Sequence, residues 1–193
     1  MMQTELLKGH QTWIETEVGS VLTLADILPE RPGLRMLIVG KTPAPVSVKV
    51  GHYFQGRQGK CFWSLLREHE IVIPTTEFED DSLLAHGCGI TDIAKLPRRY
   101  GANVPRAEYL AGAERLLEQI KVQSPRVICF VYKRVLDQIL RLKFRHGRKS
   151  AYGVNPELDA YFKAMVFVFP MPGTPCTKSE QIQAMEDLEC AFR

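Results

Sequence analysis

Three short apolar runs, each ending at a turn-forming residue or a polar loop, most constrain the fold of this chain. They occupy residues 35–40, 127–132 and 165–169. Runs of this length that are apolar throughout, without alternation, are typical of strands buried on both faces of a sheet. Because such strands need cover on each side, the runs predict a parallel sheet rather than a half-exposed antiparallel one.

The segments between these runs have helical periodicity. The clearest case is residues 106–122, where Leu110, Ala113, Leu117 and Ile120 recur at steps of three and four. Weaker patterns of the same kind occupy residues 62–68, 134–142 and 178–192. Strands that alternate with helices predict an α/β fold, a three-layer sandwich in which a mainly parallel central sheet is covered by helices on both faces.

Length and composition suit one domain. The chain has 193 residues, 45% of them hydrophobic and 24% charged, which is enough to bury a single core but cramped for two. We therefore predict one domain over residues 1–193, in which residues 1–33 form a lead-in segment before the first strand.

Cysteine usage gives no sign of a metal or cofactor. The five cysteines are widely spaced, with no CxxC pair and no histidine at zinc-finger spacing. An iron–sulfur cluster would need four convergent thiolates. The first residues also lack a long apolar run. We expect reduced thiols, no metal, no iron–sulfur cluster, no other cofactor and no membrane segment, in a cytoplasmic protein that is a monomer by default.

The balance of charge permits a polyanionic partner without requiring one. The formal net charge is +3 and the isoelectric point is near 8.6. Positive residues gather in two places, Lys95–Arg98–Arg99 and the run 143–149. Either group could contact phosphates or simply lie on a solvated surface.

Ligands of parallel sheets bind beyond the carboxyl ends of the strands. This rule directs attention to residues 41–59, after the first predicted strand, and residues 170–177, after the last. The first loop contains GKTP at 40–43 and GHYFQG at 51–56, followed by FW at 62–63, and the last contains PMPGTP at 170–175. Between them lies CGITDI at 88–93.

Taken together and in this order, these motifs resemble those of the mismatch-specific uracil- and thymine-DNA glycosylases, a family within the uracil-DNA glycosylase superfamily. The resemblance runs over roughly residues 23–190. It implies an enzyme that removes uracil from DNA and leaves an abasic site for base excision repair. The partner would be DNA, bound through a flipped-out base.

The resemblance also implies roles for the loop residues. Phe54 matches the aromatic residue that stacks on the flipped base in the family, with His52 and Tyr53 beside it. Backbone groups at Gly40, Lys41 and Pro43 would approach the base edge, which small and proline-rich loops allow. The last loop would track the DNA backbone and fill the space left by the nucleotide, with an apolar tip as a wedge; its residues are Met171, Pro172, Gly173, Thr174 and Pro175.

The catalytic position departs from the family pattern. Members of the family usually hold the attacking water with an asparagine, and Thr42 stands at that position here. Asp92 is the natural substitute, because a carboxylate can orient or deprotonate water and offset charge on the sugar. An N-terminal cap is the alternative role for Asp92. His52 is another candidate for the base, although the resemblance suggests DNA contact or packing of the loop for it. Lys41 is not favoured as a Schiff-base lysine.

Two alternatives to uracil removal stay open. A changed first motif could favour hypoxanthine or xanthine over uracil, or the chain could be a DNA-binding protein that has lost catalysis. A third possibility, a different enzyme on a doubly wound sheet, predicts a glycine-rich phosphate loop, and neither common form occurs in the sequence.

Overall fold

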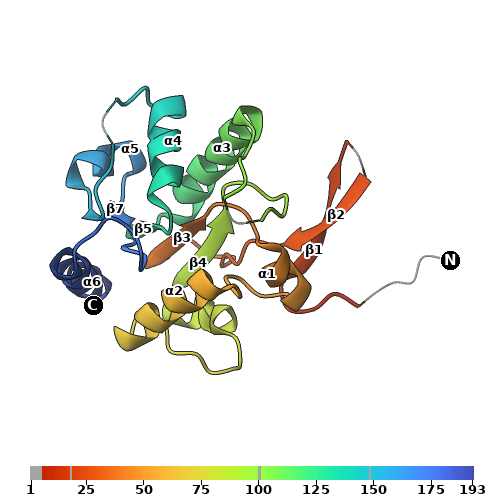
Figure 1. Cartoon of the computed structure of the whole chain (residues 1–193), viewed down its shortest axis with the longest axis horizontal. Coiled ribbons are helices and arrows are strands. Elements are labelled where there is room, and N and C mark those ends of the chain that lie inside the picture. The colour runs from red at the N-terminus through yellow and green to blue at the C-terminus, as the bar shows by residue number, and fades with distance from the viewer. Residues whose placement is uncertain (1–5, 18, 100, 148) are drawn as a thin grey trace.

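The computed structural model of the chain describes residues 6–17, 19–99, 101–147 and 149–193. Its centre is a five-stranded sheet in the order β4-β3-β5-β7-β6 (Figure 1). The strands are β3 (Met36–Gly40), β4 (Cys88–Asp92), β5 (Val127–Phe130), β6 (Gly153–Val154) and β7 (Met165–Val168). All neighbours pair in parallel except β6, which is antiparallel to β7 at one edge.

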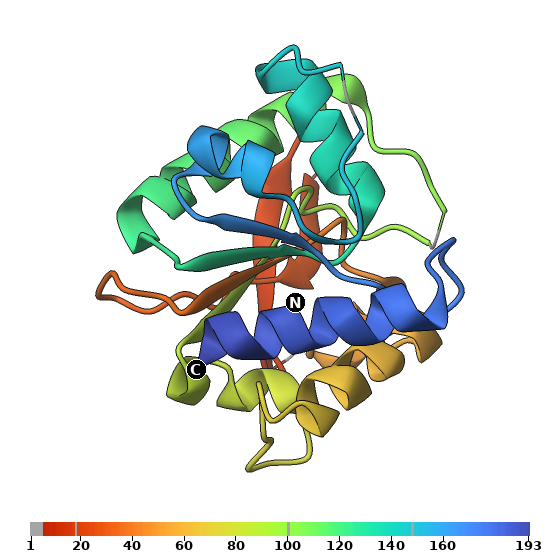
Figure 2. The same ribbon diagram turned by 90° about the vertical axis from the view of Figure 1, so that its left-hand side faces the viewer.

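Helices cover both faces of this sheet, as Figure 2 shows edge-on. One face carries α2 (Arg57–Glu68) and α6 (Lys178–Phe192), and the other carries α3 (Arg106–Gln123), α4 (Lys133–Lys143) and α5 (Asp159–Phe162). The predicted three-layer α/β sandwich is therefore confirmed. None of the helices in the described ranges is long and apolar enough to cross a membrane.

The two faces enclose two separate cores. The first core contains Phe62 and Trp63 of α2, Leu188 of α6 and Ile38 of β3. On the opposite face, α3, α4 and α5 pack against the side chains that alternate with these along the strands, among them Val39 and Phe130. Every residue of β3 is buried, which explains why its sequence is apolar without alternation.

The predicted strands at 35–40, 127–132 and 165–169 correspond to β3, β5 and β7, and the four predicted helices to α2, α3, α4 and α6. Helix α2 begins at Arg57, earlier than predicted. The hydrophobic pattern did not indicate its first turn, because that turn has few hydrophobic residues. Strand β4 was not predicted as a strand. Its residues Gly89, Thr91 and Asp92 break the apolar pattern, although all five of its residues are buried.

The lead-in segment is more structured than its uneven sequence indicated. Strands β1 (Gln11–Thr16) and β2 (Gly19–Leu24) pair as an antiparallel hairpin. The chain then forms a bridge between Ile27 and Ile90 of β4. This contact brings the end of the hairpin to the carboxyl edge of the sheet, where short helix α1 (Pro45–Val50) also lies.

Candidate active site

The carboxyl ends of β3 and β4 meet where Gly40 pairs with Asp92. The fit between them is close, since a Cβ atom added to Gly40 would lie 2.1 Å from Oδ1 of Asp92 and 3.2 Å from Cζ of Phe54. Only glycine leaves room for the carboxylate and the ring at this point. The first loop and the aspartate are thus brought together by strand register, although they are far apart in sequence.

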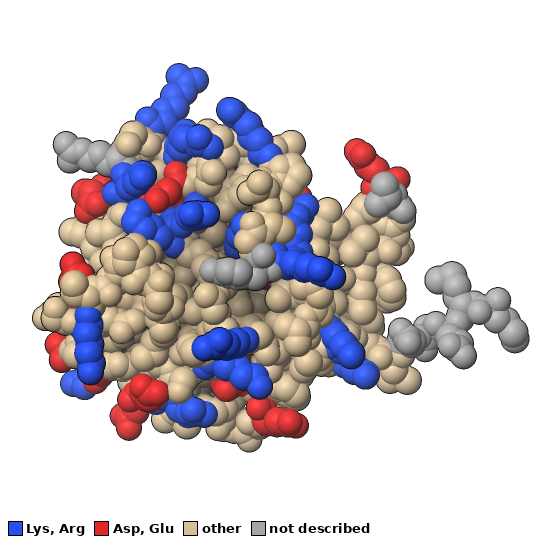
Figure 3. Space-filling view, in the orientation of Figure 1, with Lys and Arg blue, Asp and Glu red and all other residues tan. Residues whose placement is uncertain are grey.

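A cavity of about 540 Å³ opens at this edge of the sheet. Its volume is within the range typical of small-molecule sites. Figure 3 looks onto this edge and shows Lys and Arg side chains gathered around its middle, with Asp and Glu mostly toward the rim. The cavity is lined by Leu24, Thr42, Pro43, Ala44, Pro45, Val46, Ser47, Tyr53, Phe54, Gly56, Arg57, Gln58, Gly59, Asp92, Arg99 and Tyr132.

Asp92 is the chemically unusual residue of this cavity. It is 1% exposed, and neither carboxylate oxygen has a hydrogen-bond partner within the described chain. Burial raises the pKa of Asp92 to about 7; the negative charge of Asp26 adds to the effect, and Lys95 and Arg115 oppose it. A carboxylate left without partners and facing a cavity can accept a proton from whatever enters. Capping a helix, the alternative role, would need a hydrogen bond that is not seen.

Residues behind Asp92 fix its backbone rather than its carboxylate. Arg115 on α3 donates from Nη2 to the carbonyl oxygens of Asp92 (2.7 Å) and Ile93 (3.1 Å). Gly112 allows helix α3 to come this close, because a Cβ atom at that position would lie 1.8 Å from the Ile93 carbonyl oxygen. The end of β4 is therefore anchored from behind, and the side chain of Asp92 is left for the cavity.

Phe54 adopts a backbone conformation that bulky residues avoid. Its φ is 57°, in the left-handed region. Edge contacts to Phe62 and a tilted contact to Trp63 hold the ring, with centroids 5.2 and 5.8 Å away. A Cβ atom at Gly59 would lie 2.0 Å from the Phe54 carbonyl oxygen, so α2 must carry glycine there. Strain of this kind is characteristic of functional positions, and it presents the partly buried ring to the cavity.

Tyr53 forms part of the cavity wall. Its hydroxyl donates to the Ala25 carbonyl oxygen (2.9 Å), and its own carbonyl oxygen accepts from Nε1 of Trp63 (3.1 Å). Burial, together with the charge of Asp92, raises the pKa of Tyr53 well above its ordinary value. Tyr53 is therefore a neutral, fixed side chain.

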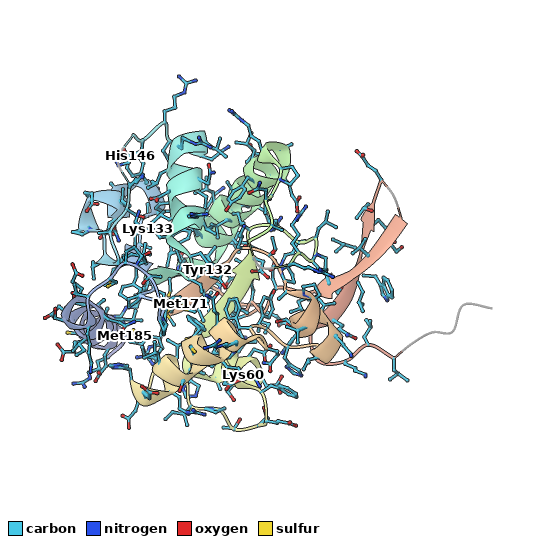
Figure 4. The ribbon with its side chains drawn as sticks, viewed as in Figure 1. Lys60, Tyr132, Lys133, His146, Met171 and Met185 are labelled. Carbon is cyan, nitrogen blue, oxygen red and sulfur yellow. The ribbon has the colours of Figure 1, made fainter. Side chains whose placement is uncertain are left out.

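Thr42 and Pro43 also line the cavity, as expected from the first motif. Several lining residues were not predicted, among them Tyr132 and Leu24, which lie outside the predicted loops. Tyr132, labelled near the middle of this face in Figure 4, follows β5, and the rule that ligands bind beyond strand ends could have indicated it. Leu24 belongs to β2, and no sequence signal linked the lead-in segment to the site.

His52 does not reach the cavity, contrary to the prediction that it lies beside the base. Its Nδ1 lies 2.9 Å from Oδ1 of Asp80, and its ring stacks on Phe78 at 3.7 Å. A buried carboxylate partner and an aromatic face hold the imidazole, which is not among the residues that line the cavity.

The side chain of Lys41 also points elsewhere, because its ammonium group donates to the Ala102 carbonyl oxygen (2.6 Å). Burial lowers the pKa of Lys41, and the positive charges of Arg134 and Arg98 lower it further. Lys41 is not among the residues that line the cavity, so only its backbone is near the base-binding region predicted for it.

The predicted DNA-contacting loop follows β7 at the same edge of the sheet. The predicted apolar tip was a Pro or a Met; Met171 is 3% exposed and packs in the core, which leaves the prolines of the loop for that role. Its carbonyl oxygen accepts from the backbone and the hydroxyl of Thr174, which closes a tight turn. Pro172, Gly173 and Pro175 are the exposed residues of this turn.

Three residues of the two positive groups are paired with acids. Lys95 forms an ion pair with Asp26, and Arg98 forms one with Glu108, whereas Arg99 lines the cavity. In the second group Lys143 pairs with Glu114, and Arg148 lies outside the described residues. Arg57, at the start of α2, is a further positive residue of the cavity that was not predicted.

Comparison with known proteins accords with this arrangement. A model of the Uracil DNA glycosylase superfamily matches residues 30–179, which include all five strands of the central sheet and Thr42, Phe54 and Asp92. A G/U mismatch-specific uracil DNA glycosylase of Schizosaccharomyces pombe is 34% identical over 120 residues, or 61% of this chain. That match spans only 36% of the relative's own length. On the extent of the family match, the chain belongs to the uracil DNA glycosylase superfamily.

Proposed function

We propose that this protein is a monofunctional DNA glycosylase that hydrolyses the N-glycosidic bond of uracil in DNA and leaves an abasic site for base excision repair. The observation that carries the proposal is Asp92, a buried carboxylate without hydrogen-bond partners in the described chain, facing a cavity beside Phe54 and Thr42. The similarity to the G/U mismatch-specific uracil DNA glycosylase of Schizosaccharomyces pombe supports the choice of uracil.

The cavity residues account for each requirement of such a reaction. A base inside the duplex is out of reach, so the nucleotide must be flipped out, and Phe54 offers an aromatic face for it to stack on. As the N-glycosidic bond breaks, the base leaves with the bonding electrons and the sugar gains oxocarbenium character. The ionised carboxylate of Asp92 offsets that charge and accepts the proton of the water that adds to the sugar carbon. The Thr42 hydroxyl can hold this water in place.

Because Thr42 replaces the usual asparagine, the base that the enzyme prefers has to be determined by experiment. A hydroxyl cannot present the paired donor and acceptor of an asparagine amide to a water or a base edge. Hypoxanthine and xanthine, which are also products of base deamination, are therefore the alternative substrates to compare with uracil.

A DNA-binding protein without activity is the other candidate, and the environment of Asp92 argues against it. An unpaired buried carboxylate destabilises a fold. Selection for binding alone would not retain a group that costs stability and makes no hydrogen bond within the described chain. Neutral residues of similar size would serve a binding cavity better.

The test is a single-turnover assay on labelled oligonucleotides that carry uracil, hypoxanthine, xanthine or thymine opposite each normal base, with alkali to reveal abasic sites. We expect cleavage at uracil, and at least a tenfold slower rate for Asp92→Asn, or about 1.4 kcal/mol in the barrier. The matched control is Asp137→Asn, which changes a carboxylate on α4 that pairs with Lys133 away from the cavity.

Two results would contradict the proposal. If none of the four bases is released while abasic DNA is bound tightly, the chain is a binding protein. If Asp92→Asn cleaves as fast as the parent and the control, the residue has no part in the chemistry.

A further inference from the structure

Four potential metal ligands meet on the side of the molecule behind the Phe54 loop. They are His10, just before β1, His52, after α1, and Asp80 and Asp81 in the short helix η1 (Glu79–Ser82). One ligand atom from each lies within 4.8 Å of all the others. The cluster brings together three segments of the chain that are distant in sequence, and none of its members lines the cavity.

The spacing of the donor atoms suits a four-coordinate ion. Nδ1 of His52 lies 2.9 Å from Oδ1 of Asp80 and 3.7 Å from Oδ1 of Asp81, and Nε2 of His10 lies 3.1 Å from Oδ1 of Asp81. Adjacent ligands of a tetrahedral Zn²⁺ site are about 3.4 Å apart, given bond lengths of about 2.1 Å. The observed separations fall on both sides of that value, so small side-chain shifts would complete the coordination.

The carboxylates are oriented as metal ligands commonly are, by a second set of contacts. Oδ2 of Asp80 accepts from the backbone nitrogen of Tyr53 (2.6 Å), and Oδ2 of Asp81 accepts from the Thr76 hydroxyl (2.9 Å). Each aspartate thus uses Oδ2 to hold its position. Oδ1 of Asp80 lies toward His52, and Oδ1 of Asp81 lies toward both His10 and His52. This division leaves one oxygen from each aspartate for a cation.

Charge gives a further reason. Asp80 is fully buried beside Asp81, and within the described chain both form ion pairs only with His10 and His52. Ligand oxygens of the two carboxylates lie within 4.8 Å of each other. A divalent cation held between them would offset the repulsion between these like charges.

The backbone around the cluster is built to bring the segments close. A Cβ atom on Gly9 would lie 2.6 Å from Nε2 of His52, and Gly9 has a φ of 48°. The backbone nitrogen of His10 donates to the Gly51 carbonyl oxygen (2.8 Å). The approach of His10 to His52 is therefore fixed before any ion binds.

We propose that His10, His52, Asp80 and Asp81 form a binding site for a divalent transition-metal ion, with Zn²⁺ as the best fit. Mixed imidazole and carboxylate ligands favour such an ion over Mg²⁺, which prefers oxygen alone. The sequence had indicated no metal, because that expectation considered cysteine spacing and short motifs only. The ion would tie the β1–β2 hairpin and η1 to the loop that carries Tyr53 and Phe54, and its role is structural.

The test is titration of the chelator-treated full chain with Zn²⁺ alone, followed by calorimetry and thermal denaturation, without DNA. We expect one equivalent to bind and the Tm to rise by about 5 °C or more at a hundredfold excess over the dissociation constant. Co²⁺ in place of Zn²⁺ should give the visible absorption of a four-coordinate ion. Mg²⁺ at the same concentration should leave the Tm unchanged.

His10→Ala and Asp81→Asn should each weaken Zn²⁺ binding at least tenfold. The matched control is His69→Ala, since His69 is as exposed as His10 (25%) and also lies beside a half-buried carboxylate, Glu189. Equal Zn²⁺ affinity in the parent and in both cluster variants would overturn the proposal, as would equal stabilisation by Mg²⁺. The residues would then be a hydrogen-bonded network only. Because no DNA is present, the outcome is independent of the proposed glycosylase activity.

Discussion

At the scale of single residues, the environment of Asp92 predicts how the proposed activity depends on pH. Burial raises the pKa of Asp92 to about 7, and only the ionised form can accept a proton or offset positive charge. Single-turnover rates at subsaturating enzyme should therefore rise about tenfold per pH unit below pH 7 and level off above it.

In Asp92→Asn this ascending limb should disappear together with most of the rate. A midpoint near pH 4, the usual value for an aspartate, would mean that another environment applies during the reaction. A limb that persists unchanged in the variant would assign it to a different group.

The same residue predicts a dependence of stability on pH. The folded protein holds the Asp92 proton up to about pH 7, whereas the unfolded chain releases it near 3.8. The folded state therefore binds more protons between these values, and the free energy of unfolding falls as the pH rises through that window. The full difference is about 4 kcal/mol at 1.36 kcal/mol per pH unit.

Asparagine at position 92 has nearly the same shape and cannot ionise. Asp92→Asn should therefore exceed the parent in stability by about 2–4 kcal/mol at pH 8 and by much less at pH 4. Urea denaturation at both pH values measures this difference. A gap of the same size at the two values would show that ionisation of Asp92 is not its source.

At the scale of elements, the contact between α2 and the Phe54 loop predicts that replacing Gly59 with alanine lowers activity. Glycine in a helix normally costs about 1 kcal/mol relative to alanine, so Gly59→Ala should stabilise α2 by propensity alone. The added Cβ atom would instead lie 2.0 Å from the Phe54 carbonyl oxygen. The loop must move, and we expect uracil excision to fall at least tenfold in the single-turnover assay.

Gly56→Ala is the matched control, because Gly56 also lines the cavity and precedes α2, and its added Cβ atom would meet only a side-chain carbon of Val46 at 3.7 Å. Its activity should stay within about twofold of the parent. Similar losses in the two variants would mean that any alanine at the start of α2 disturbs the site.

Elements that sequence reasoning could predict are those whose burial is uniform. Strands β3, β5 and β7 are buried on both faces and are apolar along their whole length, and α3 keeps its periodicity through five turns. Strand β4 is equally buried, yet its polar residues serve the site rather than the core, so no hydrophobic pattern marks it. The β1–β2 hairpin packs mainly on itself, and its alternation is weak.

The candidate site could be predicted where it depends on backbone position and not where it depends on side-chain direction. Thr42 and Phe54 lie in the loop after β3, Asp92 ends β4 in the motif at 88–93, and all three line one cavity. His52 and Lys41 lie in the same motifs, but partners from distant segments, Asp80 and the Ala102 carbonyl, draw their side chains away. A local sequence pattern cannot predict hydrogen-bond partners that are this distant in the chain.

At the scale of the whole molecule, the distribution of charge is more informative than its sum. A net charge of +3 is small, and ion pairs neutralise Lys95 and Arg98 of the first positive group. Arg57 and Arg99 instead line the cavity itself, on the face where Figure 3 shows positive side chains around the middle. A DNA strand that delivers a base to the cavity would pass its phosphates over these residues.

The last prediction concerns the dependence of DNA binding on salt. Each phosphate contact releases condensed counterions, so the logarithm of the binding constant for abasic duplex DNA should fall linearly with the logarithm of salt concentration. Arg57→Ala and Arg99→Ala should each reduce that slope by about 1, measured by fluorescence anisotropy over a range of salt. Lys121→Ala is the control: Lys121 is 78% exposed near the end of α3 and thus lies at the opposite, amino edge of the sheet. Its slope should match the parent. If all three variants share the parent's slope, the phosphates follow another path across the molecule, and the positive residues of the cavity mouth contact the flipped nucleotide alone.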